Sequence, residues 1–297
     1  MPKRCRDLGK DVRRGAPAHE PLSESDAGIL ADACDEWASA CVCISGSVAA
    51  VKAPELVLGL LVQGISVDLV TTEAAQNLLE VDYRGSQPWA RLKSLAAATR
   101  LDNARSSAGT HSSNSPCSRD VGSTCRPSLH LWSDTDEWDG YNAVGIDSVL
   151  HIELAKRNRL LLIAPLCANT LATAALGLCG NLLGSVLRAW YYDLEPSFAD
   201  AIAARHGIHA VEKPVIVAPA MNSFMWHQRI TGTHLAALKQ RGIQVVPPIS
   251  KLLACGDTGT GAMAEVSNIL TVAINALKRH VAAEHEAAQQ GKPPFAP

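Results

Sequence analysis

The sequence predicts a single α/β domain with a mostly parallel β-sheet and helices on both faces. Short runs of consecutive apolar residues, of which Val215–Val217 is the clearest, indicate strands that are covered on both faces. These runs alternate along the chain with longer helical stretches, which is the order of elements in a parallel sheet. Ala and Leu are abundant, as is typical of helices that pack on a sheet.

The composition fits one large domain with extensions. Of the 297 residues, 47% are hydrophobic and 19% are charged, and the formal net charge is −2. The near-neutral charge argues against a nucleic-acid partner, and no apolar run is long enough to predict a membrane-spanning helix. The basic residues near the N-terminus lack an adjoining apolar segment, so they do not predict a secretory signal. We therefore expect a cytoplasmic protein with neither a nucleic-acid nor a membrane partner.

Nine cysteines are spread irregularly along the chain. Their odd number, without a secretory signal, predicts reduced thiols rather than a disulfide framework. Cys41 and Cys43 would share one face of a strand, and we interpret them as small core residues, because two ligands do not make a zinc site. No metal site is predicted.

The domain is expected to occupy residues 38–286, between a disordered N-terminal arm (1–37) and a flexible tail (287–297). Two insertions interrupt it, at about 82–127 and 191–212. Residues 104–127 are rich in Ser and lack apolar periodicity, which predicts a solvent-exposed loop. The expected strands are 39–45, 65–71, 128–132, 160–164, 215–217 and 243–246, and the main expected helices end near 63, 157, 178, 206, 241 and 286.

Gly46, Ser47 and Val48 follow the first expected strand and lead into a helix. A strand, a turn of small residues and a helix form the layout of an anion site, because free N–H groups at a helix N-terminus face a bound phosphate. The turn is not GxGxxG, so the dinucleotide fingerprint is absent. Many such turns contain Gly-Ser, so the spacing alone is a weak indication of binding.

The segment PVIVAPAMNSFMW, residues 214–226, is expected to be central to the molecule. Its strand ends at Pro219, and Ala220 and Asn222 follow where the carboxyl end of a strand opens into a crevice. The side chain of Asn222 can both donate and accept hydrogen bonds. From these residues alone, an N-cap of the next helix is the favoured interpretation of Asn222.

His151 and Cys255 are further candidates for chemistry. His151 lies in the first turn of a helix that Asp147 or Ser148 could cap, and a lone His at such a place is usually packed or solvated. Cys255 adjoins a glycine-rich segment that can close over a ligand and open again. Without further context, Cys255 is an ordinary loop thiol.

Several separated segments together resemble the flavin-dependent cysteine decarboxylases. The resemblance covers about residues 38–280 apart from the two insertions, and it implies a Rossmann-like flavoprotein fold. The last of the segments favours the branch of the family that acts on phosphopantothenoylcysteine over the branch that acts on peptidyl cysteine. The matching segments are GSVAA (46–50), VLHIEL (149–154), PLCANT (165–170), PAMNSFMW (219–226) and ACGDTGTGAMAE (254–265).

The resemblance implies FMN-dependent decarboxylation of 4′-phosphopantothenoylcysteine to 4′-phosphopantetheine in coenzyme A biosynthesis, without net redox change. It also implies a homotrimer with flavin sites at subunit interfaces. His151 would serve as base or orienting group in the oxidation and decarboxylation, Asn222 would hold the substrate carboxylate, and Cys255 would protonate the intermediate. The other implied substrate-binding residues are Lys156, Met225, Gly259 and Ala254. The implied FMN-binding residues are Gly46, Ser47, Val48, Thr71, Cys167, Ala168, Asn169, Thr170 and Ala220.

Three positions depart from the family pattern. Cys167 replaces Ser, which keeps the size but loses a strong hydrogen bond. Gly180 replaces Asp. Lys156 stands where Arg usually helps to hold the substrate phosphate, and Lys binds phosphate as a point charge rather than as a fork.

Two other functions remain open. Fungal halotolerance proteins share the fold and inhibit a Ser/Thr protein phosphatase, typically with long acidic tails and an incomplete catalytic set. Here residues 281–297 contain only two acidic residues, and His151, Asn222 and Cys255 are all present, which favours the enzyme. A flavin prenyltransferase also shares the fold, but it would not need the segment around Cys255.

Overall fold

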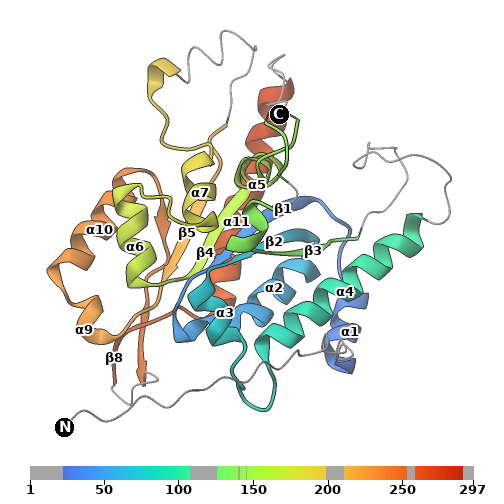
Figure 1. The fold of residues 1–297 in the computed structure, drawn as a ribbon, viewed down its shortest axis with the longest axis horizontal. Helices are drawn as coiled ribbons and strands as arrows, with labels where there is room; N and C mark the ends of the chain where they lie inside the picture. Colours follow the sequence, from blue (N-terminus) through green and yellow to red (C-terminus); the bar gives the residue numbers. More distant parts are fainter. Residues whose placement is uncertain are drawn as a thin grey trace.

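The computed structural model describes residues 23–107, 126–139, 141–144, 146–198, 211–252 and 258–289. Its centre is a six-stranded sheet in the order β3-β2-β1-β4-β5-β6, in which every neighbouring pair is parallel (Figure 1). This confirms the predicted fold class. The strands are β1 (Ala38–Ile44), β2 (Ile65–Thr71), β3 (Leu129–Ser133), β4 (Leu160–Leu166), β5 (Val215–Pro219) and β6 (Gln244–Val245).

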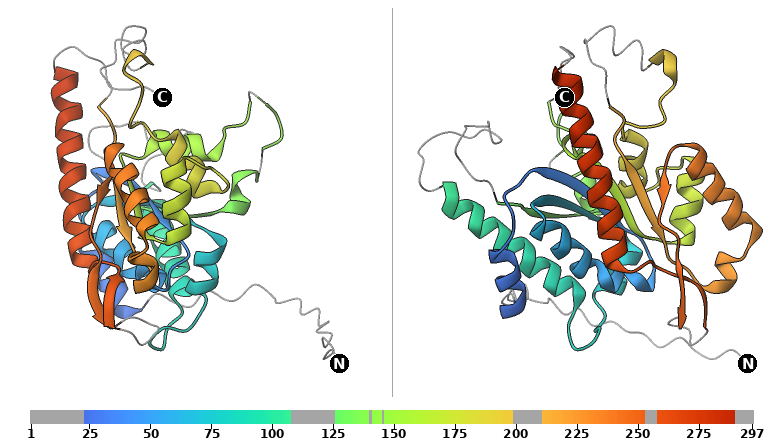
Figure 2. Two further views of the ribbon diagram at one scale, coloured as in Figure 1. Left: turned by 90° about the vertical axis from the view of Figure 1, so that its left-hand side faces the viewer. Right: turned by 180° about the vertical axis from the view of Figure 1, so that it is seen from behind.

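Helices cover both faces of the sheet (Figures 1 and 2). The first face carries α1 (Glu24–Ala31), α2 (Ala53–Val62), α3 (Glu73–Leu79), α4 (Pro88–Ser107) and α11 (Val266–Gln289). The second face carries α5 (Leu150–Arg157), α6 (Ala168–Leu176), α7 (Leu182–Ala189) and α10 (Arg229–Gln240). Short helical turns are η1 (Val48–Lys52), η2 (Asp134–Glu137) and α9 (Ser223–Trp226), and β7 (Ile249–Leu252) and β8 (Thr258–Ala262) form an antiparallel hairpin.

Alternation along β1 divides the core into two layers. Val42 and Ile44 pack in the cluster under α2 and α11, whereas Cys41 and Cys43 pack in the cluster under α5 and α7. Both thiols are fully buried, as expected for core residues, and the Cys43 thiol and burial together raise the pKa of Cys41. Among the described residues there is no group of three potential metal ligands.

Two helices lie in segments for which the sequence predicted none. The helix α1 lies within the predicted disordered arm (1–37), and α4 lies within the predicted insertion (82–127). The buried carboxylate of Asp26 in α1 accepts hydrogen bonds at 2.6 and 2.7 Å from the guanidinium of Arg91 in α4, which lower the pKa of Asp26. The predicted arm is therefore wrong for residues 23–37. Residues 1–22, and residues 108–125 of the first insertion, lie outside the described residues.

The ends of two other helices differ from the prediction. The helix α5 begins after Val149 and has no side-chain cap, so neither Asp147 nor Ser148 caps it. The Asp147 carboxylate instead accepts hydrogen bonds from the N–H groups of Asn142 and Ala143, which lower the pKa of Asp147. At the C-terminus, α11 continues three residues into the predicted tail (287–297).

Asp68 of β2 forms a buried polar junction between β2, β3 and α5. Its carboxylate accepts hydrogen bonds from Trp132 Nε1 at 2.8 Å, Arg157 Nε at 2.7 Å and Asn158 Nδ2 at 2.7 Å. Arg157 also lies over the ring of Trp132. Because a buried carboxylate requires such partners, this junction fixes the end of α5 against the sheet.

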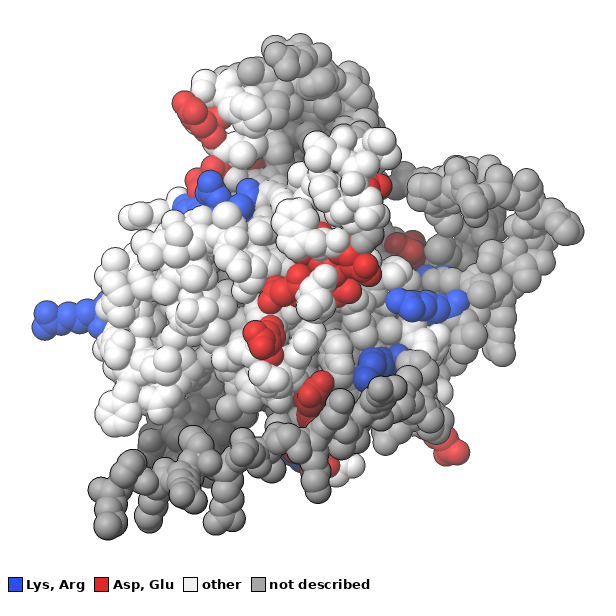
Figure 3. All heavy atoms as spheres, viewed as in Figure 1, with Lys and Arg blue, Asp and Glu red and all other residues white. Residues whose placement is uncertain are grey.

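Within the part of the chain that the structure describes, no helix is both long and apolar enough to cross a bilayer. On the face shown in Figure 3, Lys and Arg side chains are dispersed rather than gathered into one patch. The part of this face formed by α6, α9 and α10 carries few charged side chains.

Candidate active site

The site begins at the point where the chain reverses direction across the sheet. From β1 the chain proceeds outward to β2 and β3, and it then returns to β4 on the other side of β1. Ligands bind at such switch points, beyond the carboxyl ends of the strands. Ser45 fixes this junction because its buried hydroxyl donates to the carbonyl of Pro165 and accepts from the N–H of Cys167, both at 2.8 Å.

A cavity of about 500 Å³, here called the switch-point cavity, opens at this junction. The loops after β1, β4 and β5 and the end of β8 form its walls. Eight of the predicted site residues therefore meet in one place, although they come from three separate segments of the sequence. They are Gly46, Ser47, Val48, Cys167, Ala168, Ala220, Asn222 and Met225.

The walls after β1 and β4 consist of small residues at the starts of helices. Ser47 caps η1 by accepting a hydrogen bond from the N–H of Ala49, and Cys167 caps α6 by accepting one from the N–H of Thr170. Burial opposes ionisation of Cys167, but hydrogen bonds from Ser45, Thr170 and Asn169 together lower the pKa of this thiol. A Cβ atom at Gly46 would lie 2.7 Å from Cβ of Ala74, so glycine is required there.

Asn222 both caps a helix and lines the cavity. Its side-chain oxygen accepts a hydrogen bond from the N–H of Phe224 at 2.8 Å, which makes it the N-cap of α9. The same residue lines the switch-point cavity. The cap holds the amide of Asn222 in a fixed position at the cavity wall.

The hairpin β7–β8 is joined to this wall through its backbone. Met221 N–H donates to the carbonyl of Gly261 at 2.9 Å. Gly261 has a φ of 137°, and a Cβ there would lie 2.4 Å from the oxygen of Met221, so only glycine permits this approach. Gly259 lies against Ser223 but is not among the described residues that line the cavity. Ala254 and Cys255 lie outside the described residues.

Three of the predicted cofactor residues do not line the switch-point cavity. The buried hydroxyl of Thr71 donates to the carbonyl of Trp132 and accepts from the amide of Gln76, so it holds β2 and α3 together. Thr170 is buried beneath the Cys167 cap, and Asn169 is exposed. Within the predicted 167–170 segment, Cys167 and Ala168 face the cavity and Asn169 and Thr170 do not.

His151 forms a pair with a residue that the sequence did not indicate. Its Nδ1 lies 2.5 Å from Oε1 of Glu137, whose side chain is 9% exposed. Glu137 ends η2, and a capping box between Ser133 and Asp136 holds that turn at the end of β3. His151 does not line the switch-point cavity of its own chain.

Lys156 lies on the same helix as His151 and also lies outside the cavity lining. Its ammonium group is 3.4 Å from Oε1 of Glu153, and both side chains are exposed. Such a pair contributes little to stability, so the Lys156 ammonium group remains available for a ligand. The guanidinium of Arg157, by contrast, is occupied by Asp68.

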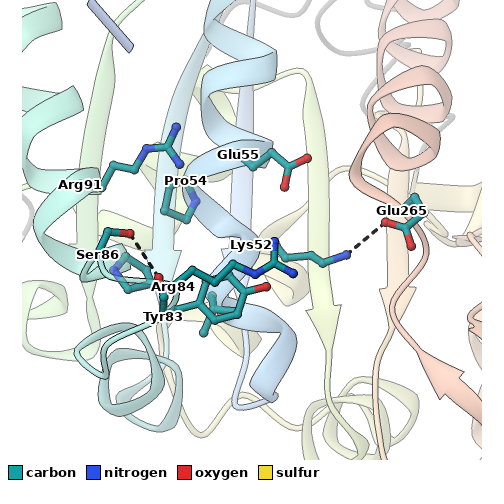
Figure 4. Close-up of a pocket in the computed structure, with 10 residues that line it drawn as sticks. Lys52, Pro54, Glu55, Tyr83, Arg84, Ser86, Arg91 and Glu265 are labelled. Atoms are coloured by element: carbon teal, nitrogen blue, oxygen red, sulfur yellow. Dashed lines mark hydrogen bonds and ion pairs between the residues drawn. The ribbon is translucent and has the colours of Figure 1, made fainter. Parts of the chain in front are cut away.

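A second pocket, of about 420 Å³, adjoins the switch-point cavity (Figure 4). We call it the loop pocket because Tyr83, Arg84 and Ser86 of the loop before α4 form one of its walls. Lys52, at the end of η1, and Arg91 of α4 face this loop. Val51, Lys52, Tyr83 and Arg84 line both hollows, so the two share a wall.

The chain is similar to several known proteins. The model of the family described as Flavoprotein matches residues 32–278. A phosphopantothenoylcysteine decarboxylase from rice is 48% identical over 149 residues, which are 50% of this chain and 59% of that protein. The mouse phosphopantothenoylcysteine decarboxylase is 37% identical over 238 residues, which are 80% of this chain and 86% of that protein. The solved structure of the FMN binding protein AtHal3 has a TM-score of 0.53 and 34% identity, and it covers 79% of this chain and 94% of that one.

Proposed function

We propose, from the premise that the chain belongs to the flavoprotein family, that it is a phosphopantothenoylcysteine decarboxylase that uses FMN. The reaction would convert 4′-phosphopantothenoylcysteine to 4′-phosphopantetheine in coenzyme A biosynthesis, in the cytoplasm. The observation that carries this proposal is the meeting of Asn222, Met225 and the 46–48 turn in one cavity at the switch point. The similarity to the mouse enzyme across most of both chains supports it.

The residues of the switch-point cavity fit a flavin mononucleotide. Small residues at Gly46 and Ala220 allow a planar ring system to approach the backbone. Ser47 caps η1, which leads directly into α2, and the first N–H groups of these helices suit a phosphate. The thiol of Cys167 and the hydroxyl of Ser47 supply further polar contacts. A bound flavin would supply reversible two-electron oxidation of the substrate thiol, which makes loss of the carboxylate feasible.

The side chains of this chain would bind the substrate and move its protons. Asn222, held by its cap, would donate through its amide to the substrate carboxylate and release it as carbon dioxide forms. Cys255 would deliver a proton to the carbon skeleton after decarboxylation. Lys156 would contact the substrate phosphate as a point charge. His151, oriented by Glu137, would accept a proton from the substrate thiol.

His151 would enter the cavity of a neighbouring subunit. Two groups of exposed apolar side chains support a head-to-tail contact, because such surfaces usually mark interfaces. One group includes Phe224, which lies between the cavity-lining residues Asn222 and Met225 in the chain, and the other belongs to the segment before His151. Different surfaces that meet in this way close into a ring when the rotation permits, and a homotrimer is such a ring. The first group is Leu176, Leu178, Phe224 and Ile230, and the second is Trp138, Val144 and Ile146.

Replacing Glu137 by Gln is expected to lower kcat by about tenfold to a hundredfold and to change KM little. A carboxylate at Nδ1 fixes the tautomer whose other nitrogen, Nε2, can accept a proton, and an amide holds it less strongly. The ¹⁵N chemical shifts of His151 should show mixed tautomers in Glu137→Gln and a single one in the parent. An unchanged ¹⁵N spectrum with unchanged kcat would contradict this role, and Glu153→Gln, on the exposed side of α5, is the matched control.

The proposed function is tested by turnover of the purified protein. The chain should copurify with FMN and release carbon dioxide and 4′-phosphopantetheine from 4′-phosphopantothenoylcysteine. Sedimentation should give three subunits for each assembly. A flavin-loaded protein without turnover, even after addition of other flavoprotein subunits, would overturn the proposal that it is an enzyme.

The second candidate is a halotolerance-type regulatory subunit of a Ser/Thr protein phosphatase. The similarity to the solved structures of AtHal3 and of HAL3 from Cryptococcus neoformans supports it, because fungal halotolerance proteins share this fold. Inhibition of a purified phosphatase catalytic subunit by this protein, with no decarboxylation, would favour this candidate. The two functions are distinguishable because only decarboxylation requires His151 and Asn222.

A further inference from the structure

The wall between the two hollows carries two cationic side chains. Lys52 projects from the end of η1, and Arg84 extends across from the loop before α4 (Figure 4). Both residues line the switch-point cavity as well as the loop pocket. The Gly46–Ala49 turn lines the same cavity. The two cations therefore border the space in which a cofactor and a substrate would meet.

Arg84 occupies a backbone conformation that its residue type disfavours. Tyr83 and Ser86 close a tight turn through two backbone hydrogen bonds. Arg84 and Gly85 between them have φ values of 57° and 81°, the pattern of a type I′ turn. Asn or Gly is preferred at the first central position, and strained residues of this kind concentrate at ligand sites. The turn therefore holds a guanidinium where local stability favours a smaller side chain.

The charges around Arg84 leave it without an acidic partner. Arg91 is occupied by the buried carboxylate of Asp26, and Lys52 forms an ion pair of 3.2 Å with Glu265. Arg84 lies over the ring of Tyr83 at 5.2 Å, but it has no hydrogen bond or ion pair to any residue that the structure describes. Its five N–H donors are therefore available to a ligand.

The carboxylates of the loop pocket do not cancel this charge. Glu265 is 54% exposed, and its pair with Lys52 is of the exposed kind that exchanges readily for a stronger ligand. The carboxylate of Glu55 acts on Arg91 rather than on Arg84. The hydrogen bonds to Asp26, together with the charges of Asp26 and Glu55, raise the pKa of Arg91. A ligand beside Arg84 and Lys52 would thus meet two cations.

We propose that Arg84 and Lys52 bind a phosphate monoester at the wall shared by the switch-point cavity and the loop pocket. A planar guanidinium can donate two parallel hydrogen bonds to phosphate, and the Lys52 ammonium adds a point charge. The inference rests on the proposed function, because both FMN and 4′-phosphopantothenoylcysteine carry such a group. Arg84 would make the site selective for the phosphorylated form of whichever molecule occupies it.

The variant Arg84→Asn separates this role from a structural one. Asn is a preferred residue at this position of a type I′ turn, so the melting temperature should stay the same or rise. Flavin-free protein is titrated with FMN and with riboflavin, and KM is measured for the substrate with and without its phosphate. If the phosphate belongs to FMN, the preference for FMN over riboflavin should fall about tenfold. If the phosphate belongs to the substrate, the ratio of KM for the substrate without its phosphate to KM for the phosphorylated substrate should instead fall by the same factor.

The control is Arg229→Asn, because Arg229 is exposed on α10 and lines neither hollow. It should alter neither ratio. The proposal would be overturned if Arg84→Asn changed neither the preference for FMN over riboflavin nor the KM ratio while its melting temperature stayed the same. If the parent binds no flavin and turns over no substrate, the proposed function fails. The phosphate site is then tested separately, by the effect of inorganic phosphate on the melting temperature. Phosphate should raise the melting temperature of the parent more than that of Arg84→Asn, and equal shifts would overturn the phosphate site.

Discussion

Subunits that carry His151→Asn, and subunits that carry Cys255→Ser, are each expected to lose product formation by roughly 10²–10⁴-fold, the range for loss of a general acid or base. Both should retain flavin, because neither His151 nor Cys255 is among the predicted flavin contacts. Cys255→Ser should accumulate the decarboxylated, oxidised intermediate, whereas His151→Asn should not. The measurement is product and intermediate formation at saturating substrate.

Co-expression of the two variants tests where the site is assembled. The β7–β8 hairpin is bonded to Met221 of the same chain, and the prediction takes Cys255 to act in the cavity of that chain. If His151 comes from the neighbour, random mixing in a ring should restore both groups at about one quarter of the sites. If each chain supplied both groups to its own site, mixing would restore none. Each variant expressed alone is the control, and the absence of recovery in mixed assemblies would contradict a shared site.

Replacing Asp68 by Ala is expected to lower the free energy of unfolding by about 3 kcal/mol, because removal of one partner leaves buried groups unpaired. Trp132, Arg157 and Asn158 would all lose their acceptor. The measurement is urea-induced unfolding at one fixed protein concentration. Since Arg157 is partly exposed and can regain water, the expected loss lies at the lower end of the range for buried pairs.

The matched control for Asp68 is Asp193→Ala. Asp193 also pairs with an arginine, Arg241, at 2.8 Å, but its side chain is 40% exposed. Exposed pairs of this kind contribute less than about 1 kcal/mol. Equal losses in the two variants would show that burial of Asp68 does not govern its contribution. The isosteric Asp68→Asn, which keeps one acceptor oxygen, should lie between the parent and Asp68→Ala.

The sequence predicted the central strands of the sheet well because β1, β2, β4 and β5 are buried on both faces. Uninterrupted short apolar runs such as 160–164 and 215–217 are typical of strands in a covered parallel sheet, and both form such strands here. The motifs also identified most of the cavity wall, because backbone turns of small residues are determined locally. Both kinds of signal depend on neighbouring residues in the chain.

What the sequence did not predict depends on partners that are distant in the chain. The helices α1 and α4 show no regular apolar face, and they are held by contacts such as the Asp26–Arg91 pair, whose members are 65 positions apart. Glu137 carries no signal of its own beside His151, because it lies 14 positions away in the chain and on a separate element, η2. For Thr71, the motif predicted a cofactor contact, but the fold uses its hydroxyl between two elements.

The ion pair between α1 and α4 joins two segments that lie outside the part of the fold recognised from its motifs. Arg91 follows three residues after Pro88, where α4 begins directly beyond the turn that carries Arg84. Loss of α1 would leave the Arg91 guanidinium uncompensated beside Arg84 and Lys52, and loss of α4 would leave a buried carboxylate alone. The two segments therefore stabilise each other, and removal of either is expected to lower the stability of the other.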